Sequence, residues 1–189
     1  EYMDHTSDTI YASFLIKKTD TIDLKDCQII IWTTTPWTIP ANKALAYNAG
    51  LKYILLEIND NKNFVNRKIV IAKDLLEPFK KDTSIENIKV LNEFLGKDLK
   101  GTVCSHPFSK MGYDYDIPML EANFVTTEQG TGIVHCAPSH GPDDFNLCLN
   151  NNIKAIETVD GDGKYTSNVK LFEGIHIFKA NPIVIEKLI

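Results

Sequence analysis

The stretch formed by residues 130–145, GTGIVHCAPSHGPDDF, constrains the fold of this chain more than any other part of its sequence. The β-branched pair at 133–134 predicts a short buried strand. The prolines and glycine within residues 138–142 then force a turn. Asp143 and Asp144 follow a proline that suits the first position of a helix, and carboxylates are favoured in a first helical turn. A strand, a polar loop and a helix start in this order aim side chains into a cleft, so the stretch has the form of a functional site.

Short apolar segments recur along the rest of the chain, and most of them lack helical spacing. The residue pattern predicts strands at 10–17, 27–32, 51–58, 68–72, 88–95, 117–126, 132–137 and 172–178. Residues 159–165 are expected to form a turn between short strands. Many short strands with few helices predict a β-rich fold, with a β-barrel core and peripheral α-helices.

Three helices are expected between or after these strands. They cover residues 73–81, ending near Pro78, then 143–151, and finally 180–189, where Asn181 is a plausible cap before Pro182. Two prolines within residues 33–42 exclude a central strand or a helix from that segment.

Size and composition indicate one ordinary globular domain. The chain has 189 residues, of which 43% are hydrophobic and 24% charged. It contains no apolar run of bilayer-spanning length, so no membrane association is expected. Because the chain begins at Glu1 and ends on an unfinished helical pattern, we interpret residues 1–189 as a single domain cut from a longer protein. Four cysteines without paired spacing favour reduced core thiols and a cytoplasmic location.

The residues of the 130–145 stretch admit a metal site or a nucleophilic pair, and neither fits well. His135, Cys136, His140 and Cys148 are suitable zinc ligands, but their spacing matches no standard pattern. Adjacent His135 and Cys136 would also point to opposite faces of a strand. Cys136 lies in an apolar strand, whereas a reactive thiolate needs an exposed, electropositive setting. We therefore expect no metal, no cofactor and a core cysteine.

Two polar features remain as candidate chemistry. Only one of Asp143 and Asp144 can point into a cleft beside His135, because neighbours on a helix diverge by about 100°, and an isolated carboxylate there suits an ammonium group. The other feature, the run 33–35 of three threonines before a proline, forms a stiff loop of uncharged donors and acceptors. Trp37 is either a core residue or a stacking surface for a base.

These residues resemble a known family. WTTTPWTIPANKALAYN at 32–48 and GTGIVHCAPSHGPDDF at 130–145 are similar to the two signature stretches of the editing domain of isoleucyl-tRNA synthetase, the connective insertion (CP1) of a class I catalytic domain. Segments 4–16, 159–166 and 172–181 resemble further parts of this insertion. Valyl and leucyl editing domains usually carry TTRP where this chain lacks the arginine, so the isoleucyl type is favoured.

The resemblance implies a function and assigns roles to residues. The domain would be a hydrolase that deacylates mischarged Val-tRNA(Ile) after transfer, with valyl-adenylate as a further candidate substrate. Asp144 would hold the α-ammonium of the valyl group, and His135 would line the side-chain pocket. The threonines would contact the ester, the terminal adenosine and the attacking water, and Asn42 would help to fix that adenosine. The candidate catalytic residues are Thr33, Thr34, Thr35 and Asp144, and the candidate substrate-binding residues are His135, Asn42, Asp144 and Trp37.

The implied partners are the acceptor end of tRNA(Ile) carrying valine and the rest of the parent synthetase. A net charge of −5 opposes strong RNA binding by the chain alone. A local basic rim is expected from Lys73, Lys80, Lys81, Lys97, Lys100 and Lys110. Two alternatives stay open: a valyl- or leucyl-type editing domain that clears another amino acid, and a non-catalytic docking module.

Overall fold

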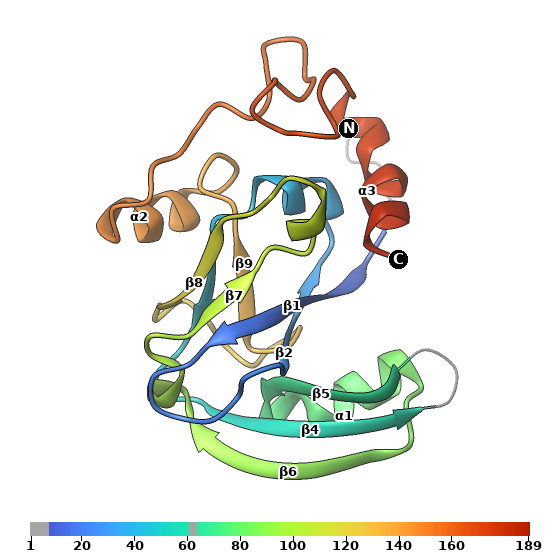
Figure 1. Ribbon diagram of the computed structural model, residues 1–189, viewed down its shortest axis with the longest axis vertical. Coiled ribbons are helices and arrows are strands. Elements are labelled where there is room, and N and C mark those ends of the chain that lie inside the picture. The colour runs from blue at the N-terminus through green and yellow to red at the C-terminus, as the bar shows by residue number, and fades with distance from the viewer. Residues whose placement is uncertain (1–7, 61–63) are drawn as a thin grey trace.

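The computed structural model describes residues 8–60 and 64–189. Strands of this part of the chain form one sheet in the order β6-β4-β5-β2-β1-β7-β8-β3-β9 (Figure 1). Their bounds are Ile10–Lys18 (β1), Gln28–Thr33 (β2), Ala44–Tyr47 (β3), Lys52–Asp60 (β4), Phe64–Ala72 (β5), Ile88–Leu95 (β6), Val103–Ser105 (β7), Asp116–Glu121 (β8) and Ile133–Cys136 (β9). The α-helices are Leu76–Thr83 (α1), Pro142–Asn150 (α2) and Ala180–Leu188 (α3), and short 3₁₀ helices are Pro36–Ala41 (η1), Lys73–Leu75 (η2), Gly96–Leu99 (η3), Ser109–Met111 (η4) and Ile177–Lys179 (η5).

The β-rich class with peripheral helices is confirmed, but the sheet is open and does not close into the expected barrel. Closure requires the first and last strands of the order to pair. Strands β6 and β9 hold those positions, and no ladder joins them within the described residues. Figure 1 shows β4, β5 and β6 with α1 in one layer, and β8 and β9 with α2 above it. No helix in the described ranges is long and apolar enough to cross a membrane.

The middle of β2, Ile29–Ile31, is apolar without interruption because both faces of the strand are buried there. Ile29 and Ile31 pack into the main core, whereas Ile30 packs into a second core beneath α1. Side chains alternate between faces with a period of two, so a continuous isoleucine run fills two cores at once. Neighbouring β5 repeats the arrangement, with Val70 in the main core and Ile71 in the second.

A third core of small side chains lies under α2. Ala44 and Ala46 of β3 meet Cys136 of β9 and Cys148 of α2 there. All four cysteines of the chain are free and buried, which confirms the expectation of core thiols. Burial strongly raises the pKa of Cys136, so its thiol stays protonated.

Several predicted elements differ from the observed ones. Residues 172–178 form turns and part of η5 and not the expected strand. The side chain of Phe172 is buried in the main core, but its backbone pairs with no strand among the described residues. Residues 159–165 contain the expected turn, but only two isolated bridges replace the short strands, one between Val159 and Tyr165 and one between Lys164 and His176. Pro78 lies in the first turn of α1, where its missing N–H costs nothing, and the helix continues to Thr83. Strands β3 and β7 were not predicted.

The prolines of η1 do not exclude a helix, contrary to the expectation for residues 33–42. Pro36 occupies the first helical position, where no hydrogen bond from its nitrogen is needed. Pro40 leaves the Trp37 carbonyl without its 3₁₀ donor, and the Tyr165 hydroxyl donates to that carbonyl instead. The Trp37 N–H donates to Asn181 Oδ1 over 3.0 Å. Asn181 therefore holds η1 and does not cap α3, which begins at Ala180 without a side-chain cap.

Gly132 brings the beginning of β9 against the end of β5. A β-carbon at this position would lie 2.3 Å from that of Ala72, and its φ of +72° disfavours other residues. The Ala72 N–H donates to the Thr131 carbonyl over 2.7 Å, and the Tyr53 hydroxyl donates to the Gly132 carbonyl over 2.7 Å. This close approach sets β9 beside β2, which places the polar residues of both strands in one region.

Candidate functional site

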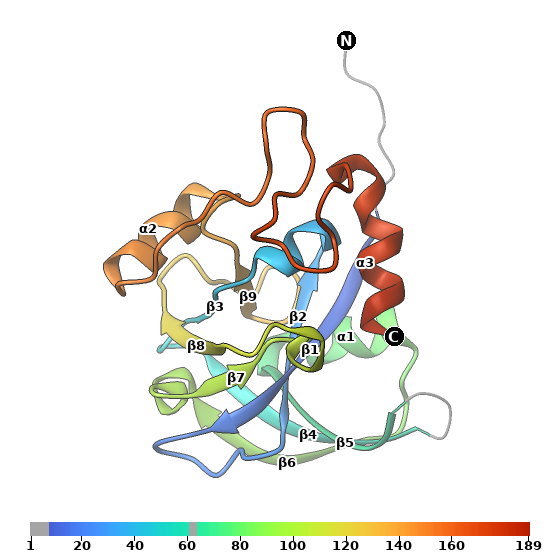
Figure 2. The same ribbon diagram turned by 45° about the horizontal axis from the view of Figure 1, so that its top comes forward.

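An open cavity of about 220 Å³ lies where β2, η1, β9 and the start of α2 meet. Figure 2 shows η1 in light blue, with α2 on one side and α3 on the other. The cavity is lined by Trp32, Thr33, Thr35, Thr38, Val134, His135, Ala137, His140 and Asp144. The two signature stretches of the sequence, about 100 residues apart, thus form a single site.

His135 is held in one orientation and one tautomer. The Asn42 amide nitrogen lies 2.8 Å from His135 Nδ1, and because an amide N–H donates, Nδ1 accepts. The ring proton is then on Nε2, which donates to Thr38 Oγ1 over 2.8 Å. Thr38 Oγ1 donates in turn to the Thr35 carbonyl over 3.0 Å. Burial lowers the pKa of His135 to about 4, so the ring is neutral at pH 7 and neither nitrogen is free to act as a base.

Asp144 presents a carboxylate at the N-terminal end of α2. Its Oδ2 accepts a hydrogen bond from the Ala137 N–H over 2.8 Å. No protein group of the described ranges donates to its Oδ1. Partial burial raises the pKa of Asp144, while the Ala137 N–H opposes the shift and the charge of Asp143 adds to it. Asp143 is exposed, so Asp144 is the member of the pair that faces the cavity, and it can receive a cationic group.

The threonine loop is ordered by its own side chains. Thr33 is buried, and its Oγ1 accepts a hydrogen bond from the Thr35 N–H over 3.0 Å. The hydroxyls of Thr33 and Thr35 lie 3.3 Å apart. Both line the cavity, so they offer donors and acceptors to a ligand or a water without adding charge.

The remaining predicted site residues lie outside the cavity lining. Thr34 is exposed and is not a lining residue. Asn42 is fully buried behind His135, where its amide also donates to the Ala44 carbonyl over 2.9 Å. Trp37 packs edge-on against His140, with ring centroids 4.7 Å apart. In this structure Asn42 therefore orients His135, while its contact with adenosine and the stacking role of Trp37 stay predictions.

Thr38, His140 and Trp32 also line the cavity, although the sequence did not predict them as site residues. Thr38 lies one 3₁₀ turn after Thr35, and the i, i+3 spacing would have revealed it if the helix had been expected. His140 reaches the cavity because its Nε2 is fixed by Thr158 Oγ1 at 2.9 Å. No group of three or more metal-ligating side chains occurs within the described part of the chain.

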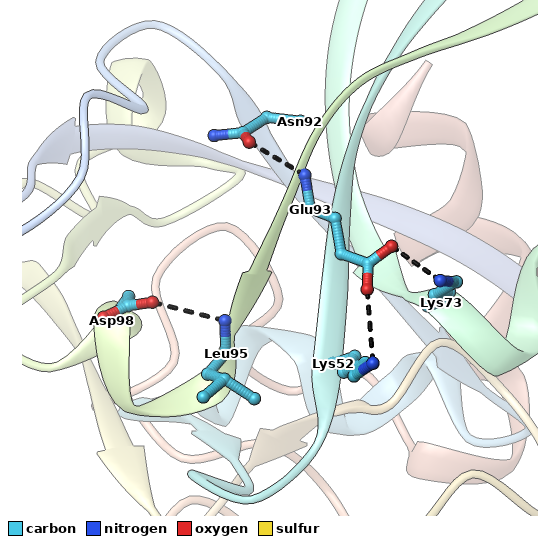
Figure 3. A network of polar contacts seen from close by, with 6 residues as sticks. All are labelled: Lys52, Lys73, Asn92, Glu93, Leu95 and Asp98. Atoms are coloured by element: carbon cyan, nitrogen blue, oxygen red, sulfur yellow. Dashed lines mark hydrogen bonds and ion pairs between the residues drawn. The ribbon is translucent and has the colours of Figure 1, made fainter.

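The expected basic rim is not part of this cavity. Lys73 pairs with Glu93 on β6 over 2.6 Å, and Lys52 approaches the same carboxylate at 3.5 Å (Figure 3). Lys80 pairs with Glu77 on α1 over 2.9 Å. None of the six lysines named for the rim lines the cavity.

Acidification is expected to destabilise the fold through its buried histidines. Burial lowers the pKa of His106 to about 3, while its Nε2 donates to the Ile39 carbonyl of η1 over 3.1 Å. The unfolded chain, with a histidine pKa near 6.5, therefore binds more protons than the folded chain below that pH. Stability is complete above about pH 6.5 and falls as the pH falls toward the folded-state values, and His106 alone accounts for about 2 kcal/mol between pH 7.5 and 5.

Urea denaturation at both pH values measures this loss. His106→Asn keeps an acceptor for the Phe108 N–H, which donates to His106 Nδ1 over 3.0 Å, but it cannot titrate. The free energy of unfolding of this variant should depend less steeply on pH. Equal pH dependence in the variant and the parent chain would contradict the assignment to His106.

Comparison with known proteins identifies the class of this fold and site. The family model described as the editing domain of leucyl-tRNA synthetase matches residues 19–180. The solved editing domain of P. knowlesi cytosolic leucyl-tRNA synthetase is similar to this chain in fold, with a TM-score of 0.67 and 12% identity over 94% of this chain and 91% of that one. The chain belongs to the editing-domain family of the aminoacyl-tRNA synthetases.

Its curated relatives specify the type. The chain is 69% identical to an isoleucine--tRNA ligase of Pelagibacter ubique (strain HTCC1062), with 100% of this chain aligned to 21% of that protein. It is 46% identical to the isoleucine--tRNA ligase of Gluconobacter oxydans (strain 621H), over 95% of this chain and 19% of that protein. The chain thus spans about one fifth of the length of these relatives, and the resemblance to the isoleucyl-type insertion is confirmed.

Proposed function

We propose that the cavity hydrolyses the ester bond of mischarged Val-tRNA(Ile) and so removes valine after its transfer to tRNA. The observation that carries the proposal is the pairing of one carboxylate, Asp144, with the neutral and immobilised ring of His135 across a small polar cavity. Asp144 Oδ1 would accept from the α-ammonium of the aminoacyl group, which is a charge-assisted hydrogen bond. His135 would limit the length of the side chain that enters.

A size limit is useful because binding alone separates valine from isoleucine poorly. One methylene in an apolar pocket contributes about 1–3 kcal/mol, a magnitude established on this very pair of amino acids. A smaller second pocket reverses the selection, since isoleucine would have to displace a ring held by hydrogen bonds on both nitrogens. Valine would enter without displacing it.

The hydrolysis we propose uses a positioned water. Its oxygen attacks the ester carbonyl carbon, and the bond from that carbon to the ribose oxygen breaks. Of the two protons of the water, one ends on the departing ribose oxygen and the other passes to solvent, so the products are the valine carboxylate and the free ribose hydroxyl. Thr33 and Thr35 would orient the water and the carbonyl oxygen. An aminoacyl ester is already activated, so positioning and charge stabilisation supply much of the rate. Two observations support hydrolysis without a protein nucleophile. Both ring nitrogens of His135 already take part in hydrogen bonds, and the Cys136 thiol is buried and protonated.

The proposed partners are the acceptor end of tRNA(Ile) and the remainder of a parent isoleucine--tRNA ligase in the cytoplasm, with residues 1–189 as one editing domain. The four-fifths of the relatives' length that this chain lacks would hold the body of the tRNA. The isoleucyl assignment rests on the 69% and 46% identity to isoleucine--tRNA ligases.

Deacylation of Val-tRNA(Ile) and Ile-tRNA(Ile) by this chain, at equal concentrations, tests the proposal. We expect release of valine at a rate at least tenfold above that of isoleucine, as the second sieve requires. Norvaline esterified to tRNA(Leu) and threonine esterified to tRNA(Val) serve as controls for the leucyl and valyl types. Preferential hydrolysis of either control would assign the domain to the corresponding leucyl or valyl type. Hydrolysis of none of the four substrates would favour a docking module.

A further inference from the structure

A second cavity, of about 120 Å³, lies beside the end of η1 and is separate from the site described above. Its lining includes two lysines, two tyrosines and two polar residues from distant parts of the chain: Lys43, Tyr113, Tyr115, Thr158, Asn168 and Lys170. No acidic residue of the described ranges lines it. The cavity therefore combines positive charge with aromatic walls, unlike the surface of a chain whose net charge is −5.

Lys43 carries an ammonium group that the protein does not neutralise. The group lies 3.8 Å from the centroid of the Tyr115 ring, in a cation–π contact. No carboxylate of residues 8–59 or 67–189 lies within 4.0 Å of it. Lys43 is half-buried, and that burial lowers its pKa. A partly desolvated cation without a counter-charge is costly, and an anion in the cavity would offset that cost.

Lys170 brings a second ammonium group to the cavity from the C-terminal third of the chain. Its Nζ donates to the Gly112 carbonyl over 3.2 Å, which uses one of three donors. The backbone carbonyl of Lys170 accepts from the Tyr113 hydroxyl over 2.6 Å, so the segment that carries the lysine is tied to the cavity wall. The remaining donors of both lysines are available to an anionic ligand.

The two cavities share their dividing wall. Thr158 lines the lysine cavity, and its hydroxyl lies 2.9 Å from Nε2 of His140, which lines the threonine–histidine cavity. The Tyr115 hydroxyl donates to the carbonyl of Asn42 over 3.1 Å, and the amide of Asn42 holds His135. A linear ligand whose end group lies in one cavity would therefore have its adjoining groups close to the other cavity.

We propose that the lysine cavity binds a backbone phosphate of the single-stranded RNA end whose terminal ester occupies the threonine–histidine cavity. The inference rests on the proposed function, since it takes that ester to be an aminoacyl-tRNA. Lysine ammonium groups bind phosphate as point charges. The Tyr115 ring keeps the Lys43 stem in place, and the acidic remainder of the surface repels RNA bound elsewhere. The site would thus guide the acceptor end into register.

Binding of an uncharged RNA oligonucleotide with the acceptor-end sequence tests the phosphate site without any hydrolysis. Fluorescence anisotropy over a series of salt concentrations is compared for the parent chain, Lys43→Gln, Lys170→Gln and the control Lys89→Gln, an exposed lysine of β6 outside the cavity. For a single strand, each lost phosphate contact should reduce the slope of log affinity against log salt by about 0.7. We expect that reduction in each cavity variant and none in the control. Unchanged slopes in both cavity variants would overturn the proposal.

Two further arms separate this proposal from its alternatives. Inorganic phosphate that displaced the oligonucleotide at equal phosphate concentration would indicate a free-phosphate site instead. Valyl-adenosine, which lacks upstream phosphates, should be hydrolysed equally by the parent chain and Lys43→Gln, whereas KM for Val-tRNA(Ile) should rise several-fold in the variant with kcat retained. If the parent chain hydrolysed neither substrate, the editing proposal would fail, while the salt slopes would still decide the phosphate site. Equal KM values for both proteins would count against the phosphate site alone.

Discussion

Asp144→Asn is expected to lower kcat/KM for deacylation of Val-tRNA(Ile) roughly 10- to 150-fold. A hydrogen bond to a charged group contributes about 1.5–3 kcal/mol, and the asparagine removes the charge that the α-ammonium would meet. The substitution keeps the side-chain shape, and its amide oxygen can still accept from the Ala137 N–H, now 2.8 Å from Oδ2. Single-turnover deacylation measures the loss.

Asp143→Asn is the matched control, because Asp143 occupies the neighbouring position of α2 and is exposed. Both substitutions remove one negative charge from the first turn of the helix, so both should cost a similar few tenths of a kcal/mol of stability. Only Asp144→Asn should lose activity. Parent-like deacylation by Asp144→Asn would show that the carboxylate acts through the Ala137 hydrogen bond alone.

Replacing His135 by alanine should open the pocket and reduce the preference for Val-tRNA(Ile) over Ile-tRNA(Ile) at least about tenfold. The imidazole is the part of the lining that is held at both nitrogens, by Asn42 and by Thr38, so its removal leaves space that isoleucine can fill. The two partners would lose their hydrogen bonds, at about 1–3 kcal/mol of folding stability. Parallel deacylation of the two charged tRNAs gives the ratio, and thermal unfolding separates the loss of selectivity from loss of fold.

The variant His135→Phe distinguishes a steric role of His135, as a size limit, from a role as a general base. Phenylalanine restores a planar ring without any nitrogen, so a variant that still removes valine and spares isoleucine would establish the ring as a size limit. Complete loss of valine hydrolysis in a folded His135→Phe variant would instead assign His135 a part in proton transfer. Undiminished discrimination by His135→Ala would place the size limit elsewhere in the cavity.

The strands with continuous or alternating apolar residues could be predicted from the sequence because their periodicity reflects burial directly. Ile29, Ile30 and Ile31 fill two cores, as expected of a strand with both faces buried. Strand β3 escaped prediction because it is four residues long and half of it is alanine, which carries little strand preference. The expected strand at 172–178 was wrong because Phe172 is buried from a turn, Phe178 is exposed in η5, and Gly174 adopts a φ of +76°.

Local sequence patterns predict the candidate site only where its residues are neighbours in sequence, and the pairing of the threonine loop with His135 and Asp144 was expected from the family resemblance alone. His135 and Asp144 belong to one strand–loop–helix unit, so their meeting follows from local structure. The positions of Thr38 and Asn42 depend on η1, whose hydrogen bonds come partly from Tyr165 and Asn181. Side chains more than 120 residues away supply those bonds, and no local pattern at residues 33–42 contains that information.

The two hydrogen bonds that fix the Trp37 backbone also impose an order on how the protein folds during its synthesis. A chain emerging from the ribosome has completed β1 and β2 long before Tyr165 and Asn181 are synthesised. Until both arrive, the proline-rich turn lacks partners for one N–H and one C=O, and contacts of such long sequence separation form late. The cleft acquires its final shape only when α3 docks against η1. The cavity to which we assign hydrolysis is therefore incomplete until almost the whole length of the domain has been translated.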